Sequence, residues 1–159
     1  MNFQNLKMTA LINAFSVFKI PALAFITPRV LEMSETRNVV RVRLDMRTRN
    51  HLGVMYFGAL AMGAELSIAL RAIQAIQDSG KKIDFIFKDF QADFLKRADG
   101  HVNFVCEEGA GVAELIAQAA ASSDRLSKTF SGYAFVPSVS EESVMKYKLT
   151  LSVKKRAKK

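Results

Sequence analysis

The sequence contains little of what builds covalent cross-links and metal sites. Its 159 residues include one cysteine, two histidines, three prolines and no tryptophan. A lone cysteine, Cys106, excludes an internal disulfide and fits a reducing compartment, so we expect a cytoplasmic protein. Cys106 alternates with Val102 and Phe104, which favours a buried structural thiol over a nucleophile. His51 and His101 have no cysteine or histidine at the spacing of metal ligands, so no metal site is expected.

The N-terminal stretch lacks an uninterrupted hydrophobic run. Lys19 and Pro21 break it, whereas a helix that spans a membrane needs about 20 apolar residues. We therefore expect a packing helix there and no transmembrane segment.

Half of all residues are hydrophobic, which suits one well-buried core in a chain too short for two full domains. The expected organisation is a single domain over 1–159, with an N-terminal helical extension at 1–27 and a basic tail at 154–159.

Hydrophobic periodicity predicts an α+β fold. Patterns that repeat every three or four residues indicate helices, and strict alternation indicates strands. Between Phe87 and Phe90 the alternation slips, as a β-bulge would make it. Asp99-Gly100 is a favourable turn sequence and predicts a hairpin with the strand that follows. The predicted helices are 5–18, 55–78 and 109–122, and the predicted strands are 29–35, 40–46, 83–94, 101–107, 126–136 and 144–153.

One carboxylate stands out in the long predicted helix. Glu65 is the only acidic or basic residue between Met55 and Leu70. Burial of a carboxylate in apolar surroundings disfavours the charged form and raises its pKa. Perturbed carboxylates gather at functional sites, which makes Glu65 the first functional candidate. The alternative is a structural role at the rim of the helix face, where the carboxylate reaches solvent or caps a buried backbone group.

Basic residues exceed acidic ones, 23 to 15, for a formal net charge of +8. Such an excess favours a polyanionic partner, which could be nucleic acid, a phosphorylated cofactor or an anionic membrane. Arginines at 37, 41, 43, 47 and 49 lead directly to Asn50. Arg41 and Arg43 fall on the polar side of a predicted strand, where a solvated face explains them. Arg47 and Arg49 are therefore the better candidates for phosphate contacts.

The order of elements from about Pro28 to Val153 resembles the hotdog fold, in which a curved antiparallel sheet wraps around a long central helix. An extra N-terminal helix precedes it here. Asn50, Gly53, Gly58 and Glu65 are spaced as in hotdog acyl-CoA thioesterases of the phenylacetate-degradation type. The chain especially resembles the branch that keeps a glutamate on the helix.

This resemblance implies a thioester hydrolase. In it Glu65 would be the base or nucleophile, Asn50 would orient water or substrate, and the backbone amides of Phe57 and Gly58 would polarise the thioester carbonyl. Helix-terminal amides are preorganised donors for a developing oxyanion. Arg47 and Arg49 would bind the phosphates of coenzyme A. The expected substrate is an acyl-CoA or acyl carrier protein thioester, with no cofactor beyond the coenzyme A of the substrate.

Helix geometry adds a constraint on that site. Nine residues at 1.5 Å each separate Tyr56 from Glu65 by roughly 13 Å, too far for both to reach one carbonyl. In hotdog relatives the helix start of one subunit faces the carboxylate of the other. We therefore expect a homodimer with two composite sites, with assembly into a tetramer left open.

The sequence departs from the resemblance where the relatives have His-Gly and this chain has Tyr56-Phe57. The Tyr56 hydroxyl could replace the missing donor. Alternatively both side chains fill the site and leave a noncatalytic acyl- or lipid-binding protein. A third reading is a basic module that binds polyanions through the arginines, the Lys146 and Lys148 row and the tail at 154–159. It lacks aromatic residues among the basic ones, so nucleic acid is not the expected partner.

Overall fold

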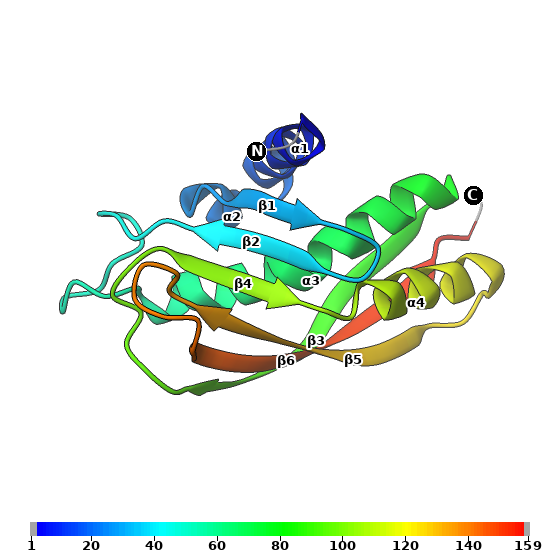
Figure 1. The fold of residues 1–159 in the computed structure, drawn as a ribbon. Coiled ribbons are helices and arrows are strands. Elements are labelled where there is room, and N and C mark those ends of the chain that lie inside the picture. The colour runs from blue at the N-terminus through cyan, green and yellow to red at the C-terminus, as the bar shows by residue number, and fades with distance from the viewer. Residues whose placement is uncertain (1–2, 158–159) are drawn as a thin grey trace.

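A curved sheet of six antiparallel strands encloses one long helix (Figure 1). The computed structural model describes residues 3–157 of the chain. The strands lie in the order β1-β2-β4-β5-β6-β3. This arrangement confirms the α+β class and the hotdog architecture that the sequence predicted. The helices are α1 (Phe3–Lys19), α2 (Pro21–Phe25), α3 (Phe57–Ser79) and α4 (Gly109–Ala121), and the strands are β1 (Arg29–Met33), β2 (Asn38–Val42), β3 (Ile83–Phe94), β4 (Val102–Cys106), β5 (Leu126–Phe135) and β6 (Ser143–Lys155).

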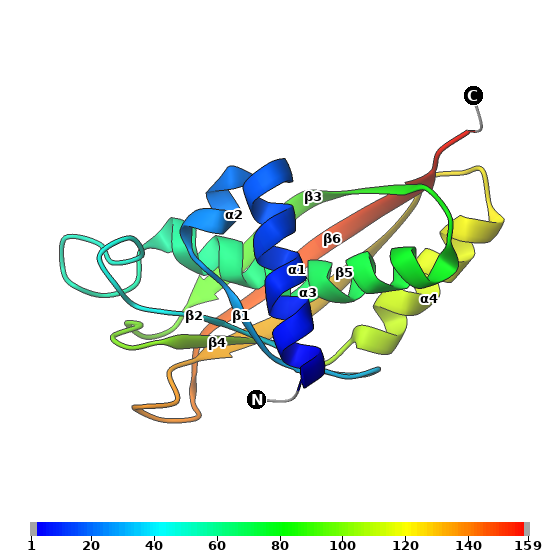
Figure 2. The same cartoon turned by 90° about the horizontal axis from the view of Figure 1, so that it is seen from above.

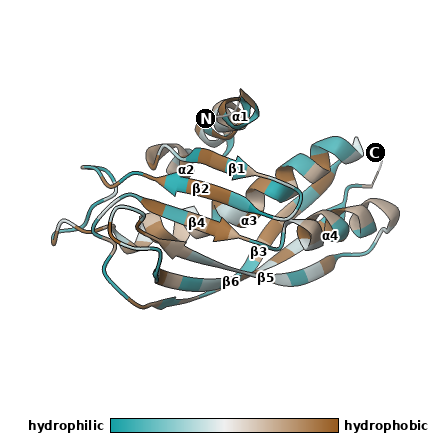
Figure 3. Cartoon of the chain, in the orientation of Figure 1, coloured by the Kyte–Doolittle hydropathy of each residue, from teal (hydrophilic) through white to brown (hydrophobic). Residues whose placement is uncertain are grey.

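Helix α3 is the helix that the sheet encloses. It contains no proline and ends at Gly80, whose φ of 61° is the left-handed conformation that terminates many helices. Hydrophobic residues of β1, β2 and β4, seen as brown segments in Figure 3, include the fully buried Val30, Val40 and Phe104. By length and composition α3 could cross a membrane, but most of it is packed inside the protein. It is the core helix of the domain.

The bulge predicted in β3 is confirmed. Phe87 pairs with Leu151 and Phe90 pairs with Leu149, so two residues of β3 stand opposite one of β6. The Thr150 amide donates to the Asp89 carboxylate at 3.0 Å across the bulge. The extra residue shifts the alternation of inward and outward side chains by one position. Phe87 and Phe90 therefore both pack against the core.

The predicted hairpin across Asp99-Gly100 is wrong. Strand β3 pairs with β6 only, and β4 pairs with β2 and β5. Gly100 does not have the positive φ that a tight hairpin turn of this type requires. The segment between the strands instead carries the chain from the edge of the sheet to its middle.

Two further boundaries differ from the prediction. The strand predicted at 40–46 ends at Val42, because Asp45 forms a turn in which its carbonyl accepts from the amides of Thr48 and Arg49. The predicted solvated tail begins later than residue 154. Lys155 is still in β6 and donates to the carbonyl of Ala120, which lies at the end of α4. The last two lysines of the predicted tail lie outside the described residues.

Helix α1 covers the β1 edge of the sheet. Asn5 donates to the Leu31 carbonyl at 2.5 Å and Asn13 donates to the Pro28 carbonyl at 3.0 Å. The Thr9 hydroxyl accepts from the Val30 amide at 2.9 Å. These three side chains are four residues apart and therefore lie on one face of the helix. Unpaired edge strands invite association, so the N-terminal extension protects β1. Within residues 3–157 no strand pairs with the outer edge of β3.

Candidate functional site

A cleft of about 640 Å³ lies between the N-terminal helices, α3 and β3. Its walls are mostly apolar, and the bulged part of β3 forms one of them. Because the bulge turns Phe87 and Phe90 inward, aromatic rings line much of the cleft, and Lys88 and Asp89 of the bulge line it as well. The side chains that carry the following argument are Phe15, Ile20, Met62, Glu65, Phe87 and Phe90.

Glu65 is the carboxylate that α3 contributes to this cleft. The side chain is partly buried, and no hydrogen bond or ion pair of Glu65 occurs within the described part of the chain. Burial alone raises the pKa of Glu65 above its ordinary value. The sequence-based expectation of a carboxylate in apolar surroundings is thereby confirmed. A raised pKa makes the ionised carboxylate a stronger base, which suits a general base.

The start of α3 has free backbone donors. Within residues 3–157 nothing accepts from the amides of Phe57, Gly58 and Ala59, and Tyr56 supplies no side-chain cap. These amides point out of the positive end of the helix dipole, where a developing negative charge is stabilised. The donors predicted from Phe57 and Gly58 are therefore available.

Tyr56 lies against these donors. A Cβ atom added to Gly58 would be only 2.5 Å from the Tyr56 ring, so the ring already occupies that space. The Phe57 ring stands edge-on to Tyr56, with centroids 6.4 Å apart, and packs near Phe94 at 5.7 Å. Tyr56 and Phe57 are each about half exposed. Both aromatic side chains therefore border the helix start.

Asn50 and the two candidate arginines lie on the loop between β2 and α3. The Asn50 side chain accepts from the Leu52 amide at 2.9 Å and so shapes this loop. Arg47 pairs with Asp45 at 2.9 Å, and this contact raises the pKa of Arg47. Arg49 is exposed, and its backbone bridges to Met55 beside the helix start. This loop leads directly into the start of α3.

The helix start and Glu65 are not adjacent in one chain. Eight residues from Phe57 to Glu65 correspond to about 12 Å along the helix. Phe57 and Gly58 therefore lie at the start of α3, Asn50 lies on the loop before it, and Glu65 lies in the cleft along the side of the helix.

Sequence reasoning did not anticipate that the N-terminal extension lines the cleft. Phe15 of α1 and Ile20, which joins α1 to α2, approach Glu65 from about 45 residues away in the sequence. A periodic pattern identifies a helix but gives no information on which distant residues it contacts. Cys106, by contrast, is buried as predicted, and burial raises the pKa of its thiol to about 11.

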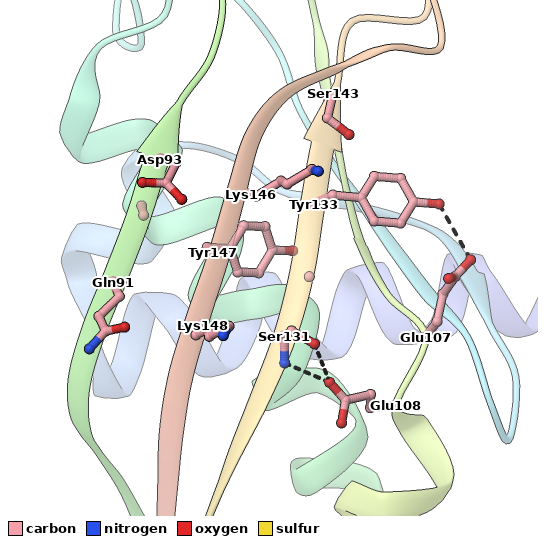
Figure 4. Close-up of a pocket in the computed structure, with 12 residues that line it drawn as sticks. Gln91, Asp93, Glu107, Glu108, Ser131, Tyr133, Ser143, Lys146, Tyr147 and Lys148 are labelled. Atoms are coloured by element: carbon pink, nitrogen blue, oxygen red, sulfur yellow. Dashed lines mark hydrogen bonds between the residues drawn. The ribbon is translucent and has the colours of Figure 1, made fainter.

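A second depression, of about 650 Å³, lies over β3, β6 and β5 (Figure 4). Two of its three carboxylates have structural partners. Glu108 accepts from the amide and hydroxyl of Ser131, and Glu107 accepts from the Tyr133 hydroxyl. The third, Asp93, has no hydrogen bond or ion pair within residues 3–157 but is exposed on β3. Desolvation raises the pKa of the buried Tyr147 hydroxyl. Partial burial therefore distinguishes the Glu65 carboxylate from that of Asp93.

A family model described as a domain of unknown function, DUF4442, matches residues 8–125. No curated protein matches the chain. Solved structures resemble it over nearly their whole length. They include a proposed thioesterase from Shewanella oneidensis, with 10% identity, a TM-score of 0.77 and coverage of 93% of this chain and 98% of that one.

Two further similar structures are a thioesterase from Haemophilus influenzae and a variant of a thioesterase from Pseudomonas aeruginosa. The first is 15% identical, with a TM-score of 0.65 over 91% of this chain and 88% of that one. The second is also 15% identical, with a TM-score of 0.67 over 92% and 94%. At these identities the likeness establishes the fold, and the chemistry must come from the site.

Proposed function

Because the chain belongs to the DUF4442 family and has a hotdog fold, we propose that it hydrolyses acyl thioesters, with Glu65 as the base or nucleophile. One observation carries the proposal: Glu65 is an unpartnered carboxylate in an apolar cleft, and burial raises its pKa. Holding a charge in such surroundings costs free energy, and catalysis is a reason to keep it. The names of the similar thioesterases support the reaction class.

The proposed site is composite and forms in a homodimer. Strand β3 has a free edge of twelve residues, whereas α1 covers the edge at β1. Pairing of two β3 edges would extend the sheet and satisfy the exposed backbone groups. A two-fold axis at this edge would repeat the contact and create two equivalent sites. In each, the helix start and Asn50 of one subunit would face Glu65 of the other.

The substrate would be held at both ends. The acyl chain would lie among Phe15, Met62 and Phe87 in the cleft, because these side chains are apolar. Arg47 and Arg49 would bind the phosphates of coenzyme A or of an acyl carrier protein's prosthetic group. The free amides of Phe57 and Gly58 would stabilise the oxyanion that forms when the thioester carbonyl is attacked.

The first experiment measures thiol release from acyl-CoA substrates of increasing chain length. Glu65→Gln keeps the size of the side chain and removes the carboxylate, so turnover should fall about 10²–10⁴-fold. Glu114→Gln, which changes an exposed carboxylate on α4, is the matched control and should keep its activity. Equal activity of the wild type and Glu65→Gln, with both folded, would reject the assignment.

The helix start can be tested without disturbing the helix. Phe57 is the first residue of α3, and Tyr56 before it has φ −66° and ψ 141°. Proline is well tolerated at a first helical position after an extended residue. Phe57→Pro therefore removes one amide donor, and Phe57→Ala controls for the lost ring. Turnover should fall about 10²–10³-fold in Phe57→Pro only.

Mixing the two inactive variants tests the composite site. A heterodimer of Glu65→Gln and Phe57→Pro would contain one site with both lesions and one site with neither. Random exchange of subunits should restore about a quarter of wild-type activity. Failure to recover activity, although heterodimers form, would contradict a site shared between subunits.

A second function, binding of acyl groups without turnover, is favoured by the position of Tyr56. Its ring occupies space next to Gly58 that a thioester would need. In that case the wild type would bind fatty-acyl ligands without releasing thiol. Tyr56→Ala should then open the helix start and increase acyl-CoA affinity, whereas in an enzyme that uses the Tyr56 hydroxyl it should lower turnover.

A further inference from the structure

Helix α1 has three faces with different partners. Met8, Ile12 and Ser16 are buried against the core. Asn5, Thr9 and Asn13, described above, bind the backbone around β1. The remaining face is exposed, and a soluble helix normally carries polar residues there.

This exposed face is apolar. Leu6 is 49% exposed, Val17 56% and Phe3 81%. At 100° per residue these positions form one stripe along the helix. Two more exposed phenylalanines adjoin the stripe: Phe18, in the last turn of α1, is 82% exposed, and Phe25, at the end of α2, is 57% exposed. Figure 2 shows α1 and α2 together on the side of α3 that the sheet leaves open. We name this surface the α1–α2 apolar face, consisting of Phe3, Leu6, Ala10, Ala14, Val17, Phe18, Ile20 and Phe25.

The charged residues of the segment that forms this face are all basic. Lys7, Lys19 and Arg29 are exposed on the N-terminal segment, and the first acidic residue of the chain is Glu32. The formal charge of the whole chain is +8. Large exposed apolar side chains flanked by lysines, on a segment without acidic residues, match a surface that carries negative charge over an apolar interior.

A second copy of the chain fits this face less well. The stripe on α1 is roughly 21 Å long and 10 Å wide, on the order of 200 Å². A stable dimer buries about 800 Å² on each partner. In a two-fold pair the lysines of each copy would also come together and repel. A lipid surface requires no complementary shape, and its anionic headgroups would neutralise these lysines.

We propose that the α1–α2 apolar face docks on an anionic lipid bilayer, with its phenylalanines at the depth of the upper acyl chains and Lys7 and Lys19 among the headgroups. The helices lie on the membrane and do not cross it. Phe15 and Ile20, which line the Glu65 cleft, belong to the same segment. Docking therefore places the cleft beside the lipid, where long-chain acyl thioesters partition. This consequence for the substrate rests on the proposed function, but the docking does not.

The test is flotation of the full-length protein with phosphatidylcholine vesicles, with and without about 30% phosphatidylglycerol. The wild type should float with the anionic vesicles and lose binding as salt rises, because surface electrostatics are screened. Phe18→Gln with Phe25→Gln should lower partitioning about a hundredfold, since each buried phenylalanine contributes about tenfold. Val139→Gln, at a 65% exposed valine between β5 and β6, is the matched control and should bind like the wild type.

Three results would overturn the proposal. One is a folded wild type that does not float with either kind of vesicle, and another is an equal loss in Val139→Gln. The third is sedimentation showing that the Phe18 and Phe25 changes dissociate an oligomer, which would assign the face to a second copy. Vesicle binding by Glu65→Gln separates this proposal from the enzymatic one, because loss of turnover should leave the binding unchanged.

Discussion

The Tyr147 hydroxyl lies 2.7 Å from the Ser67 hydroxyl, inside the protein, and joins strand β6 to helix α3. Tyr147 also donates to the Val105 carbonyl at 3.1 Å. Ser67 is two residues after Glu65, so the two side chains point about 200° apart around the helix. The hydrogen bond that holds Ser67 toward the sheet therefore turns Glu65 away from it and into the cleft.

Tyr147→Phe should destabilise the protein by about 1–3 kcal/mol, because the Val105 carbonyl and the Ser67 hydroxyl lose a partner inside the protein. Chemical denaturation measures the change. In Ser67→Ala with Tyr147→Phe, the two losses should not add, since they remove one shared interaction. Additive effects in that double-mutant cycle would show that the hydroxyls act independently.

The proposed thioesterase activity should depend on the ionisation of Glu65. Burial raises the pKa of Glu65 above its ordinary value of 4.5, so kcat/KM should rise with pH along a limb whose midpoint lies above that value. Met62→Gln, which places an amide in the same cleft, should reduce the desolvation, lower the pKa and move the limb to lower pH. If the limb of the kcat/KM profile does not move in Met62→Gln, the group that titrates is not Glu65.

Stability should show the opposite dependence on pH. A carboxyl whose pKa is raised by folding holds its proton more tightly in the folded state. Its contribution to the free energy of unfolding is therefore largest below the ordinary value of 4.5, falls as pH rises and levels off above the raised value. Glu65→Gln has no such proton to lose. At fixed protein concentration, the variant should gain stability relative to the wild type between about pH 4 and neutrality, and parallel denaturation curves would contradict this.

Gly63 lies where α3 packs tightly against Phe104 of β4. A Cβ atom added there would lie 2.3 Å from the buried Phe104 ring. Gly63→Ala should therefore cost about 1–3 kcal/mol in spite of the better helix propensity of alanine. Gly111→Ala in α4 is the contrasting case, because its nearest neighbours are 3.4 Å away. Thermal unfolding should show Gly111→Ala equal to or more stable than the wild type.

Local patterns predicted most elements because their causes are local. Alternation and its slip located β3 and its bulge between Phe87 and Phe90 within the sequence itself, since each side chain's face depends only on its position along the strand. The hairpin at Asp99-Gly100 failed because strand pairing depends on where distant segments pack. In the native sheet β6 binds β3, some 60 residues later in the chain.

For the candidate site, too, the sequence predicted the local features and missed the long-range contacts. An isolated carboxylate among apolar helical residues marked Glu65, and the spacing back to Asn50 and Gly58 suggested the reaction class. Neither gave the wall that Phe15 contributes, because a contact over about 50 residues leaves no periodic signal. The composite arrangement and the roles of Arg47 and Arg49 remain predictions.

The sequence by itself determined the kinds of elements, their approximate limits and the presence of an isolated carboxylate on an apolar helix, because hydrophobic spacing and helix termination act over a few residues. Tertiary structure decided which strand has a free edge, which helix covers the other edge, and where Glu65 points. Those outcomes depend on the burial of side chains by partners far away in the chain, such as Tyr147 against Ser67 and Asn13 against the Pro28 carbonyl. Only the folded molecule brings these groups within hydrogen-bonding distance.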